Sequence, residues 1–226
     1  MNLKIVFFHL NLLIKIYSGT IVISAHHKPD ADGKFEDQNN DEIIVSISIA
    51  ECDMRCSLNP RCVSFFYNSL TKLCIVHSNP FTYTVITKSG TGWRFYVTRD
   101  RTGRCPDNFF LYRQLDFCYQ FMPSLMAAYI SCPLGTLQRI DTEEKQNYTM
   151  KITANIELVY DDAICMQGKN TGEGWKFLDG TPMTYFNWNW NQPKFDSNQL
   201  RMIRNKNYVW FATADTKYCS YLCEYP

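Results

Sequence analysis

The chain has 226 residues, a formal net charge of +1 and a hydrophobic content of 46%. This length allows one or two globular domains, and the composition is that of neither a disordered chain nor a bundle of membrane helices. Lysine and arginine form no long runs, so the sequence carries no electrostatic signature of binding to nucleic acid or to an anionic membrane. Aromatic residues make up 15%, which is typical of small loop-rich domains because each aromatic side chain buries a large area.

The first 25 residues have the pattern of an export signal. Lys4 precedes an apolar stretch over residues 5–16, and small residues follow at Ser24 and Ala25. The alternative is a transmembrane anchor, but polar residues interrupt the stretch, which falls short of the roughly 20 apolar residues that span a bilayer. We therefore predict a signal peptide at residues 1–25, cleaved near Ser24 or Ala25, and a mature protein that leaves the cell.

Ten cysteines follow this segment, and an even number behind an export signal indicates disulfides. Four lie between residues 52 and 74 and six between 105 and 223. Two modules that pair internally leave three possible pairings in the first and fifteen in the second. Structural zinc is the alternative, but the spacings lack the CxxC knuckles or added histidines that zinc sites favour. The ten are Cys52, Cys56, Cys62, Cys74, Cys105, Cys118, Cys132, Cys165, Cys219 and Cys223.

The first module is expected over residues 26–99, with a polar linker at 97–104. A helix carries Cys52 and Cys56, which lie four residues apart and so share one helix face, and Asn59-Pro60 ends it. Nested bridges, Cys52–Cys74 around Cys56–Cys62, fit these spacings. Strands are expected at Ile43–Ile49, Val63–Tyr67, from Cys74 to Val76, Phe81–Ile86 and Trp93–Val97.

The first cysteine cluster resembles a known family. The pattern Cys-x3-Cys-x5-Cys-Val-Ser-Phe-Phe-Tyr-Asn…Cys is similar to that of the PAN/apple family, and the resemblance covers residues 30 to 98. It implies a module that binds proteins or carbohydrates and has no catalytic residues. The alternative is an unclassified disulfide-rich spacer.

The second module, expected over residues 104–226, opens with an aromatic hairpin over 105–119 that is closed by its own bridge. Pro123 suits the first turn of a helix. The residues after it follow helical spacing and predict one buried stripe. These residues are Leu125, Ala128, Tyr129 and Cys132.

A second helix is predicted to start at Asp141–Glu144, which reads as a capping box. Tyr148, Ile152 and Ile156 would share one face of this helix. Asn147-Tyr-Thr149 is the one glycosylation sequon, and its asparagine lies about 100° round the helix from the apolar face. We therefore predict glycosylation at Asn147.

The C-terminal half resembles the C-type lectin-like family in its long form. The resemblance implies an α+β fold with two helices and a looped antiparallel sheet, and it pairs Cys105 with Cys118 and Cys132 with Cys223. The family's usual second internal bridge is missing, because Leu200 and Asp215 hold its positions. We infer a substitute bridge between Cys165 and Cys219. The motifs that carry the resemblance are Gly174–Pro182, Phe186-Asn-Trp188, Asn191-Gln-Pro193, Tyr208-Val-Trp210 and Cys223-Glu-Tyr225.

The resemblance also locates the family's calcium site, and this chain departs from it there. Gln192-Pro193 is kept, but Lys194 follows and would repel a cation. Phe211 and Ala212, which follow Trp210, offer no side-chain oxygen, and Asp196 is the sole carboxylate between residues 187 and 200. A calcium ion needs 6–8 oxygen ligands. We therefore expect no calcium site of the usual kind and no other cofactor.

Ligand recognition could proceed without a metal. Trp190 and Tyr185 are candidates for an exposed surface that stacks on sugar rings or anchors a protein, with polar contacts from neighbouring side chains. Trp188 is expected in the core. The alternative is that these aromatics fill a loop-rich domain. The polar candidates are Asn189, Asn191, Gln192 and Lys194.

Catalysis is not expected. Residues 78–226 contain no histidine, which excludes a Ser-His-Asp hydrolase or a His-ligated zinc from the larger module. The carboxylate pairs Asp161-Asp162 and Glu143-Glu144 consist of adjacent residues, which point in different directions in regular structure.

Two functions from different classes fit the sequence. The first is a secreted recognition protein that binds glycans or glycoproteins, with innate defence as its setting and with other extracellular proteins as partners of the first module. The second is a structural protein of an extracellular matrix or of mucus that acts through protein contacts. Neither function involves nucleic acid or a membrane span.

Overall fold

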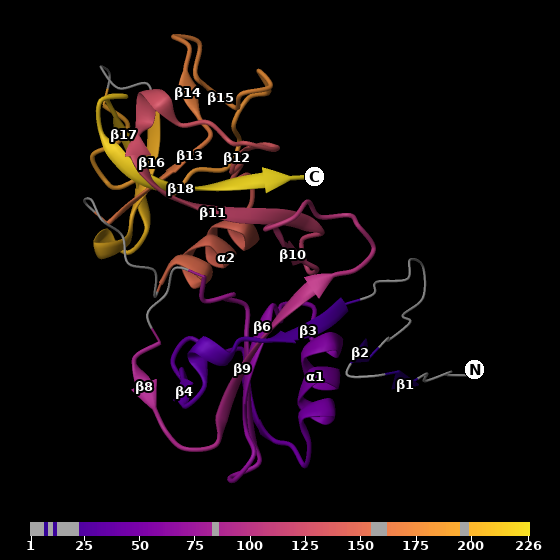
Figure 1. Cartoon of the computed structure of the whole chain (residues 1–226). Coiled ribbons are helices and arrows are strands. Elements are labelled where there is room, and N and C mark those ends of the chain that lie inside the picture. Colours follow the sequence, from indigo (N-terminus) through magenta and orange to yellow (C-terminus); the bar gives the residue numbers. More distant parts are fainter. Residues whose placement is uncertain (1–6, 9–10, 13–22, 83–85, 155–161, 195–198) are drawn as a thin grey trace. The chain divides into compact units, whose positions relative to one another are not determined.

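The chain forms two compact units, Met1–Cys118 and Tyr119–Pro226, in a computed structural model (Figure 1). Within the described part of the chain, no helix combines the length and apolar character needed to cross a membrane. The described residues are 7–8, 11–12, 23–82, 86–154, 162–194 and 199–226.

The first unit is built on a five-stranded antiparallel sheet with the strand order β3-β9-β6-β7-β5. Helix α1 (Ile49–Leu58) lies against it (Figure 1). The sheet strands are β3 (Ile23–His27), β5 (Glu42–Val45), β6 (Ser64–Asn68), β7 (Leu73–His77) and β9 (Trp93–Asp100). The smaller elements are β1 (Phe7–Phe8), β2 (Asn11–Leu12), the 3-10 turn Pro29–Ala31, β4 (Lys34–Phe35) and β8 (Lys88–Ser89).

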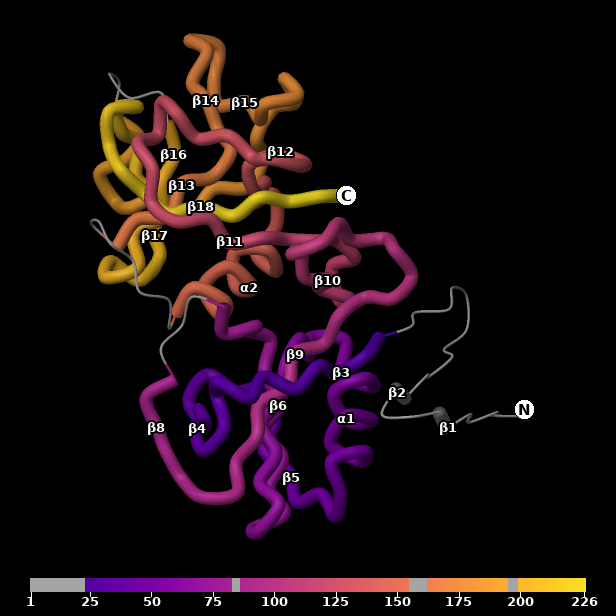
Figure 2. Tube along the Cα trace, in the orientation of Figure 1, coloured from indigo at the N-terminus to yellow at the C-terminus, as the bar shows by residue number. Residues whose placement is uncertain are grey.

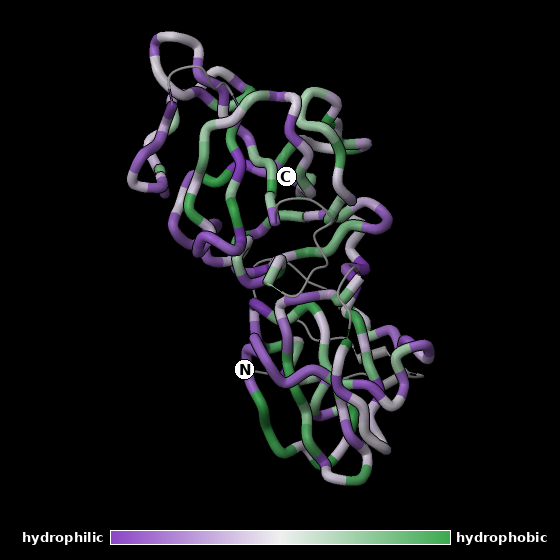
Figure 3. Tube along the Cα trace, turned by 90° about the vertical axis from the view of Figure 1, so that its left-hand side faces the viewer, coloured by the Kyte–Doolittle hydropathy of each residue, from purple (hydrophilic) through white to green (hydrophobic). Residues whose placement is uncertain are grey.

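Both faces of this sheet are covered, which explains why its central strand β6 is apolar at consecutive positions. Phe65 points toward α1 and stacks on Tyr96 with ring centroids 5.0 Å apart. Phe66 points to the other face, where it packs against Phe95 and Phe81. Neither Phe65 nor Phe66 is exposed to solvent. Hydrophobic and hydrophilic stretches alternate along the trace of each unit (Figure 3).

Helix α1 is fixed at both ends, as its sequence allows. The Ser48 hydroxyl accepts a hydrogen bond from Glu51 N at 3.1 Å, and the Glu51 carboxylate accepts one from Ile47 N at 2.8 Å. This reciprocal pair is a capping box. The predicted bridges Cys52–Cys74 and Cys56–Cys62 tie the helix to β7 and to the loop before β6.

Three predicted segments of this unit differ in the structure. The strand expected over Ile43–Ile49 ends at Val45 because Ser48 caps the helix. The expected linker over 97–104 begins as strand, since β9 continues to Asp100 and pairs with β3. The strand expected over Phe81–Ile86 is absent from the described ends of that segment, and its middle, 83–85, lies outside the described residues.

The predicted aromatic hairpin belongs to the first compact unit. It consists of β10 (Phe110–Tyr112) and the start of β11 (Phe117–Met126), which continues into the second unit, and Cys105–Cys118 closes it. Phe110 packs against the core cluster that contains Phe66 and Phe95.

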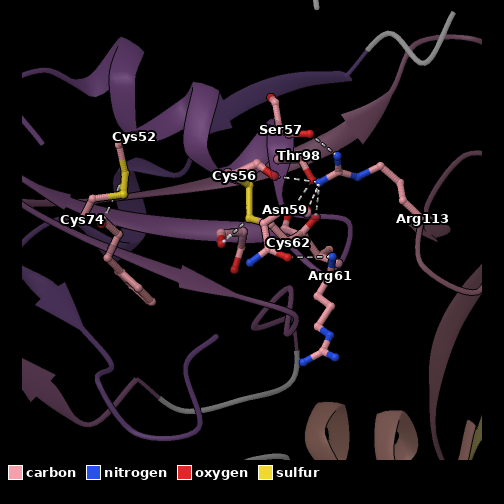
Figure 4. The surroundings of a disulfide bond; sticks show 12 residues. Cys52, Cys56, Ser57, Asn59, Arg61, Cys62, Cys74, Thr98 and Arg113 are labelled. Carbon is pink, nitrogen blue, oxygen red and sulfur yellow. Dashed lines mark hydrogen bonds between the residues drawn. A yellow bond between two sulfur atoms is a disulfide. The ribbon is translucent and has the colours of Figure 1, made fainter. Parts of the chain in front are cut away.

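Arg113, at the tip of this hairpin, reaches the C-terminal end of α1 (Figure 4). Its guanidinium donates to the carbonyl oxygens of Cys56 at 2.8 Å, Asn59 at 2.6 Å and Cys62 at 3.0 Å, and also to that of Ser57. The last carbonyls of a helix have no partner within the helix and carry partial negative charge. Arg113 therefore caps α1 from a segment more than 50 residues away in sequence.

Asp53 lies near this guanidinium and is itself only 9% exposed. Burial raises the pKa of the Asp53 carboxyl to about 6, and the positive charge of Arg113 partly opposes the rise. Burial likewise lowers the pKa of Arg113, to about 10. Desolvation of both groups thus outweighs their mutual attraction.

The second unit is a looped sheet with the strand order β11-β18-β13-β16-β17, and β12 also pairs with β18 (Figure 2). Its helix is α2 (Glu143–Thr153). A core cluster that includes Leu200, Met202 and Trp210 underlies the sheet. The strands are β12 (Thr136–Leu137), β13 (Ala163–Met166), β14 (Lys169–Asn170), β15 (Trp175–Lys176), β16 (Gln199–Ile203), β17 (Val209–Thr213) and β18 (Tyr218–Tyr225), and the 3-10 turns are Ala127–Tyr129 and Arg204–Lys206.

The helix predicted after Pro123 is wrong: the segment is the end of β11 followed by a 3-10 turn. The backbone N–H groups of Ala127 and Ala128 bond to Lys217 O and Asp215 O, both at 2.8 Å. Pairing with the connection before β18 thus satisfies donors that a helix would have used. The predicted buried stripe is absent, since Leu125 is 36% and Tyr129 69% exposed.

Helix α2 forms as predicted, but its cap is one residue later than expected. Thr142, not Asp141, accepts the capping hydrogen bond, from Lys145 N at 3.2 Å. Tyr148 and Ile152 are buried, and Ile156 lies outside the described residues.

The two remaining bridges of this unit are those expected. Cys132 pairs with Cys223, and Cys165 pairs with Cys219, so the strand β13 is linked to β18. Leu200, at one position of the usual family bridge, is instead fully buried in the core. In place of the usual family bridge, this chain thus has the Cys165–Cys219 bridge between the neighbouring strands β13 and β18.

The position of β3 predicts the effect of an N-terminal deletion. Ile23 and Ser24 are 7% and 3% exposed and pair with Asp100 and Arg99 of β9. A chain that starts at His26 loses this half of the strand, so its free energy of unfolding should fall by about 2–4 kcal/mol relative to a chain that starts at Ile23. Thermal denaturation of the two chains measures the difference. Equal midpoints would show that β3 contributes nothing to stability.

The buried carboxyl predicts a pH dependence of stability. Because the folded-state pKa of Asp53, about 6, lies above that of an unfolded Asp at about 3.9, the folded state holds its proton more tightly. The free energy of unfolding should therefore decrease as the pH rises from about 4 to about 6, by up to about 3 kcal/mol.

Urea denaturation of wild type and Asp53→Asn at several pH values tests this prediction. The variant should lose less stability than wild type as the pH rises to 7. Asp30→Asn, which alters an exposed carboxyl, is the matched control and should follow wild type. Parallel profiles for wild type and Asp53→Asn would contradict the prediction.

Candidate functional site

The predicted ligand-binding residues lie in the 185–194 loop, which connects β15 to β16. Hydrogen bonds to β17 hold its first half: Trp210 N donates to Asn187 O at 2.7 Å, and Asn189 N donates to Trp210 O at 3.0 Å. These bonds place Trp188 beside Trp210 in a parallel bridge. The first half of the loop is thus hydrogen-bonded to the sheet through β17.

Gln192 holds the second half of the loop. Its backbone N–H donates to Asn189 O at 2.9 Å, and its side-chain Oε1 accepts from Ala212 N at 3.0 Å. The peptide bond between Gln192 and Pro193 is cis. The side-chain oxygen of Gln192 is therefore occupied by the protein's own backbone.

Aromatic rings fill the space beneath the loop. Trp210 is fully buried, and its indole N–H donates to Gln146 Oε1 at 2.8 Å. Tyr185 packs edge-on against Trp210 with centroids 5.6 Å apart. Burial raises the pKa of the Tyr185 hydroxyl, and the charge of Glu143 adds to the rise. Tyr185 thus packs against the core and remains partly accessible at the surface.

The six predicted site residues are not equally available to a ligand. Trp190 is 87% exposed, and Asn191 and Lys194 are also exposed, whereas Tyr185, Asn189 and Gln192 are half-buried. The loop thus presents one indole ring flanked by an amide and an ammonium group. Such a set can pack on an apolar ring face and donate hydrogen bonds.

Phe186 was not predicted as a site residue, yet it lies at the surface of the loop with 38% exposure. It stacks on the half-buried Trp188, with an interplanar angle of 12° and centroids 5.6 Å apart. The sequence Phe-Asn-Trp gives little indication of this exposure. In a strand, Phe186 and Trp188 would share one face, but the pattern does not tell whether that face is buried or exposed.

The described residues contain no group of three or more His, Cys, Asp or Glu side chains that could hold a metal ion. In that part of the chain every cysteine is in a disulfide, so none is available to zinc. Asp196 lies outside the described residues. The Gln192 side-chain oxygen already accepts a hydrogen bond, and Lys194, where the chain departs from the family pattern, is exposed.

The carboxylate pairs noted in the sequence do not face a common site. Asp162 forms an ion pair with Arg204 at 2.6 Å, and Asp161 lies outside the described residues. Glu143 and Glu144 occupy the first turn of α2, where negative charge is favourable.

Comparisons with known proteins give one family match and several similar solved structures. Residues 31–97 match the family model described as PAN domain, and no curated protein sequence matches the chain. The mouse scavenger receptor C-type lectin carbohydrate-recognition domain is 21% identical, with a TM-score of 0.44, over 54% of this chain and 97% of that structure.

Two antifreeze proteins are similar to the same extent. The Ca2+-free form of a Ca2+-dependent type II antifreeze protein is 23% identical, with a TM-score of 0.45, over 54% of this chain and 100% of that one. A calcium-independent type II antifreeze protein is 19% identical, with a TM-score of 0.44, over 54% and 93%. Residues 31–97 are thus similar to PAN domains, and 54% of the chain is similar to each of these three solved structures.

Proposed function

We propose that this chain is a secreted recognition protein that binds carbohydrate or glycoprotein ligands through the 185–194 loop. The observation that carries the proposal is the 87% exposure of Trp190. An indole ring left in water forgoes a large hydrophobic gain, and buried aromatics already fill the core beneath it. Its exposure is accounted for if the ring packs against a ligand.

The loop is suited to binding because its backbone is fixed before a ligand arrives. Asn187, Asn189 and Gln192 are hydrogen-bonded to each other or to β17. A loop that is already ordered loses little conformational entropy when it binds, so more of the contact energy becomes affinity.

Binding in this proposal needs no calcium. The Gln192 oxygen accepts from Ala212 N, and Lys194 carries a positive charge on the loop. A cation would have to displace the first interaction and tolerate the second. The proposed role is recognition rather than catalysis, with innate defence as its setting.

Secretion is supported by the five disulfides, because such bridges persist in oxidising compartments outside the cytosol. Asn147 is exposed on α2, whereas Thr149 of the same sequon is buried and donates to Lys145 O at 2.8 Å. An attached glycan would project into solvent from this position.

The alternative is a structural protein of a matrix or of mucus, and one observation favours it. The edge strand β5 and the residues after it expose Ile43, Val45 and Ile47 by 48%, 74% and 80%. An apolar strand at the edge of a sheet can pair with another chain. This surface would then carry assembly.

Replacing the exposed indole should remove ligand binding without unfolding the protein. On a glycan array, Trp190→Ala should weaken the binding seen for wild type by about tenfold or more, with calcium or with a chelator alike. Tyr129→Ala removes an aromatic ring that is 69% exposed outside the loop and should bind as wild type does. Glycan binding that needs calcium would contradict the metal-free site. An absence of binding together with self-assembly on gel filtration would favour the structural role.

Expression in a eukaryotic secretory host should yield a glycosylated protein. Treatment with an N-glycosidase should reduce its mass by one glycan, and Asn147→Gln should abolish the shift. The variant should remain secreted because Asn147 is exposed. Secreted wild-type protein with no glycan at this position would contradict the prediction.

A further inference from the structure

Positively charged side chains gather along one edge of the sheet of the first unit, on or directly after strands β3 and β9. Ser24 pairs with Arg99 and His26 with Val97, and directly paired residues point to the same face of a sheet. Lys28 continues this pairing, since its backbone N–H donates to Phe95 O at 2.9 Å. We call Lys28, Arg99 and Arg101 the cationic edge.

Arg101 is held in place by neutral groups. Its Nε donates to Ser24 Oγ at 2.7 Å, and its Nη2 lies 3.3 Å from His26 Nε2. The Ser24 hydroxyl is also 2.9 Å from His26 Nε2. An arginine can donate to this imidazole nitrogen only if His26 is neutral. Burial, and then the charges of Arg101, Arg99 and Lys28, lower the pKa of His26, which agrees with that state.

None of the three cations forms an ion pair with a described residue, in contrast to Arg104, which pairs with Asp116. The neighbouring acid, Asp100, turns away, since it pairs with Ile23 on the opposite face. Its carboxylate accepts from the Thr102 hydroxyl and from the backbone N–H groups of Thr102 and Arg104. Burial raises the pKa of Asp100, but these bonds outweigh it, so the pKa lies below its usual value. In the described part of the chain, the three cations of the edge are thus not paired with a carboxylate.

We propose that the cationic edge binds an anionic glycan chain through its sulfate or carboxylate groups. A positioned guanidinium can bind such groups through two parallel hydrogen bonds. Lys28 lies opposite Phe95, which is four positions before Arg99 on β9. Four positions correspond to about 13 Å along a strand. That length exceeds one small anion and suits a chain that carries several.

A glycan fits this surface better than single-stranded nucleic acid does. Sites for single strands combine positive charge with aromatic rings on which bases stack. The exposed residues Tyr129, Phe186, Trp190 and Tyr218 all lie in the second unit, and no Phe, Tyr or Trp over residues 23–82 or 86–118 is exposed. The site is independent of the 185–194 loop and so does not rest on the function proposed for it.

The test uses a chain that starts at Ile23, which keeps Ser24 and its bond to Arg101, and heparin as the sulfated probe. Wild type should bind heparin at about 50 mM salt and more weakly at about 200 mM. The triple variant Lys28→Gln/Arg99→Gln/Arg101→Gln should lose about tenfold or more in affinity, which equals about 1.4 kcal/mol. Desulfated heparin and hyaluronan, which keep their carboxylates, show whether sulfate is required.

A matched control removes the same charge elsewhere. Arg94→Gln/Lys206→Gln/Lys217→Gln alters three exposed cations, one of them on β9, and should bind heparin within about twofold of wild type. Trp190→Ala should also retain heparin binding, which separates this site from the loop. Should the first triple variant unfold, Lys28→Gln/Arg99→Gln leaves the Arg101–Ser24 bond intact and should still weaken binding.

Three results would overturn the proposal. One is an absence of heparin binding by wild type at low salt. Another is an equal loss of affinity in both triple variants, which would mean that net charge rather than the cationic edge governs binding. The third is equal or tighter binding of single-stranded DNA of the same charge, which would assign the edge to a different class of polymer.

Discussion

The first unit depends on one half-buried cation, Arg113, at the end of its only described α-helix. Arg113 supplies donors to four carbonyl oxygens around the Cys56–Cys62 bridge. Those of Cys56 and Ser57 lie in the last turn of α1 and have no partner within the helix, whereas that of Asn59 also accepts from Cys62 N at 3.0 Å. The same guanidinium compensates part of the desolvation of Asp53. Removing it would leave both a buried carboxyl and a set of carbonyls unpaired, which costs more than the pair contributes when intact.

Sequence patterns predicted the elements that have a recognisable spacing of cysteines or apolar residues. The helix that carries Cys52 and Cys56, the strands β6, β7 and β9, and all five bridges follow from spacing together with family resemblance. The segment after Pro123 failed because its apolar spacing fits a helix, whereas the backbone donors of Ala127 and Ala128 find acceptors near β18. Hydrophobic periodicity reflects which side chains share a face. It does not show whether a backbone N–H group finds a hydrogen-bond acceptor far away in the sequence.

The same limit applies to the surfaces that we interpret as sites. The composition of the 185–194 loop identified Trp190, because the residues lie together in sequence. The cationic edge could not be found this way, since Ser24 and Arg101 are 77 residues apart and become neighbours only when β3 pairs with β9. A chain with a net charge of +1 can thus hold a concentrated positive edge that no run of lysine or arginine announces.

Both proposed sites share one physical feature, which is a group left unsatisfied by an otherwise complete framework. Trp190 is exposed above aromatic rings that are buried and hydrogen-bonded. Arg101 is positioned by a hydroxyl and an imidazole that orient its charge without neutralising it. Positioning by neutral partners keeps the cost of ordering low and leaves the interaction for a ligand to complete. An apolar ring face and a fixed cation call for different ligand groups, so the ring face of Trp190 suits neutral sugars and the cationic edge suits sulfated or carboxylated ones.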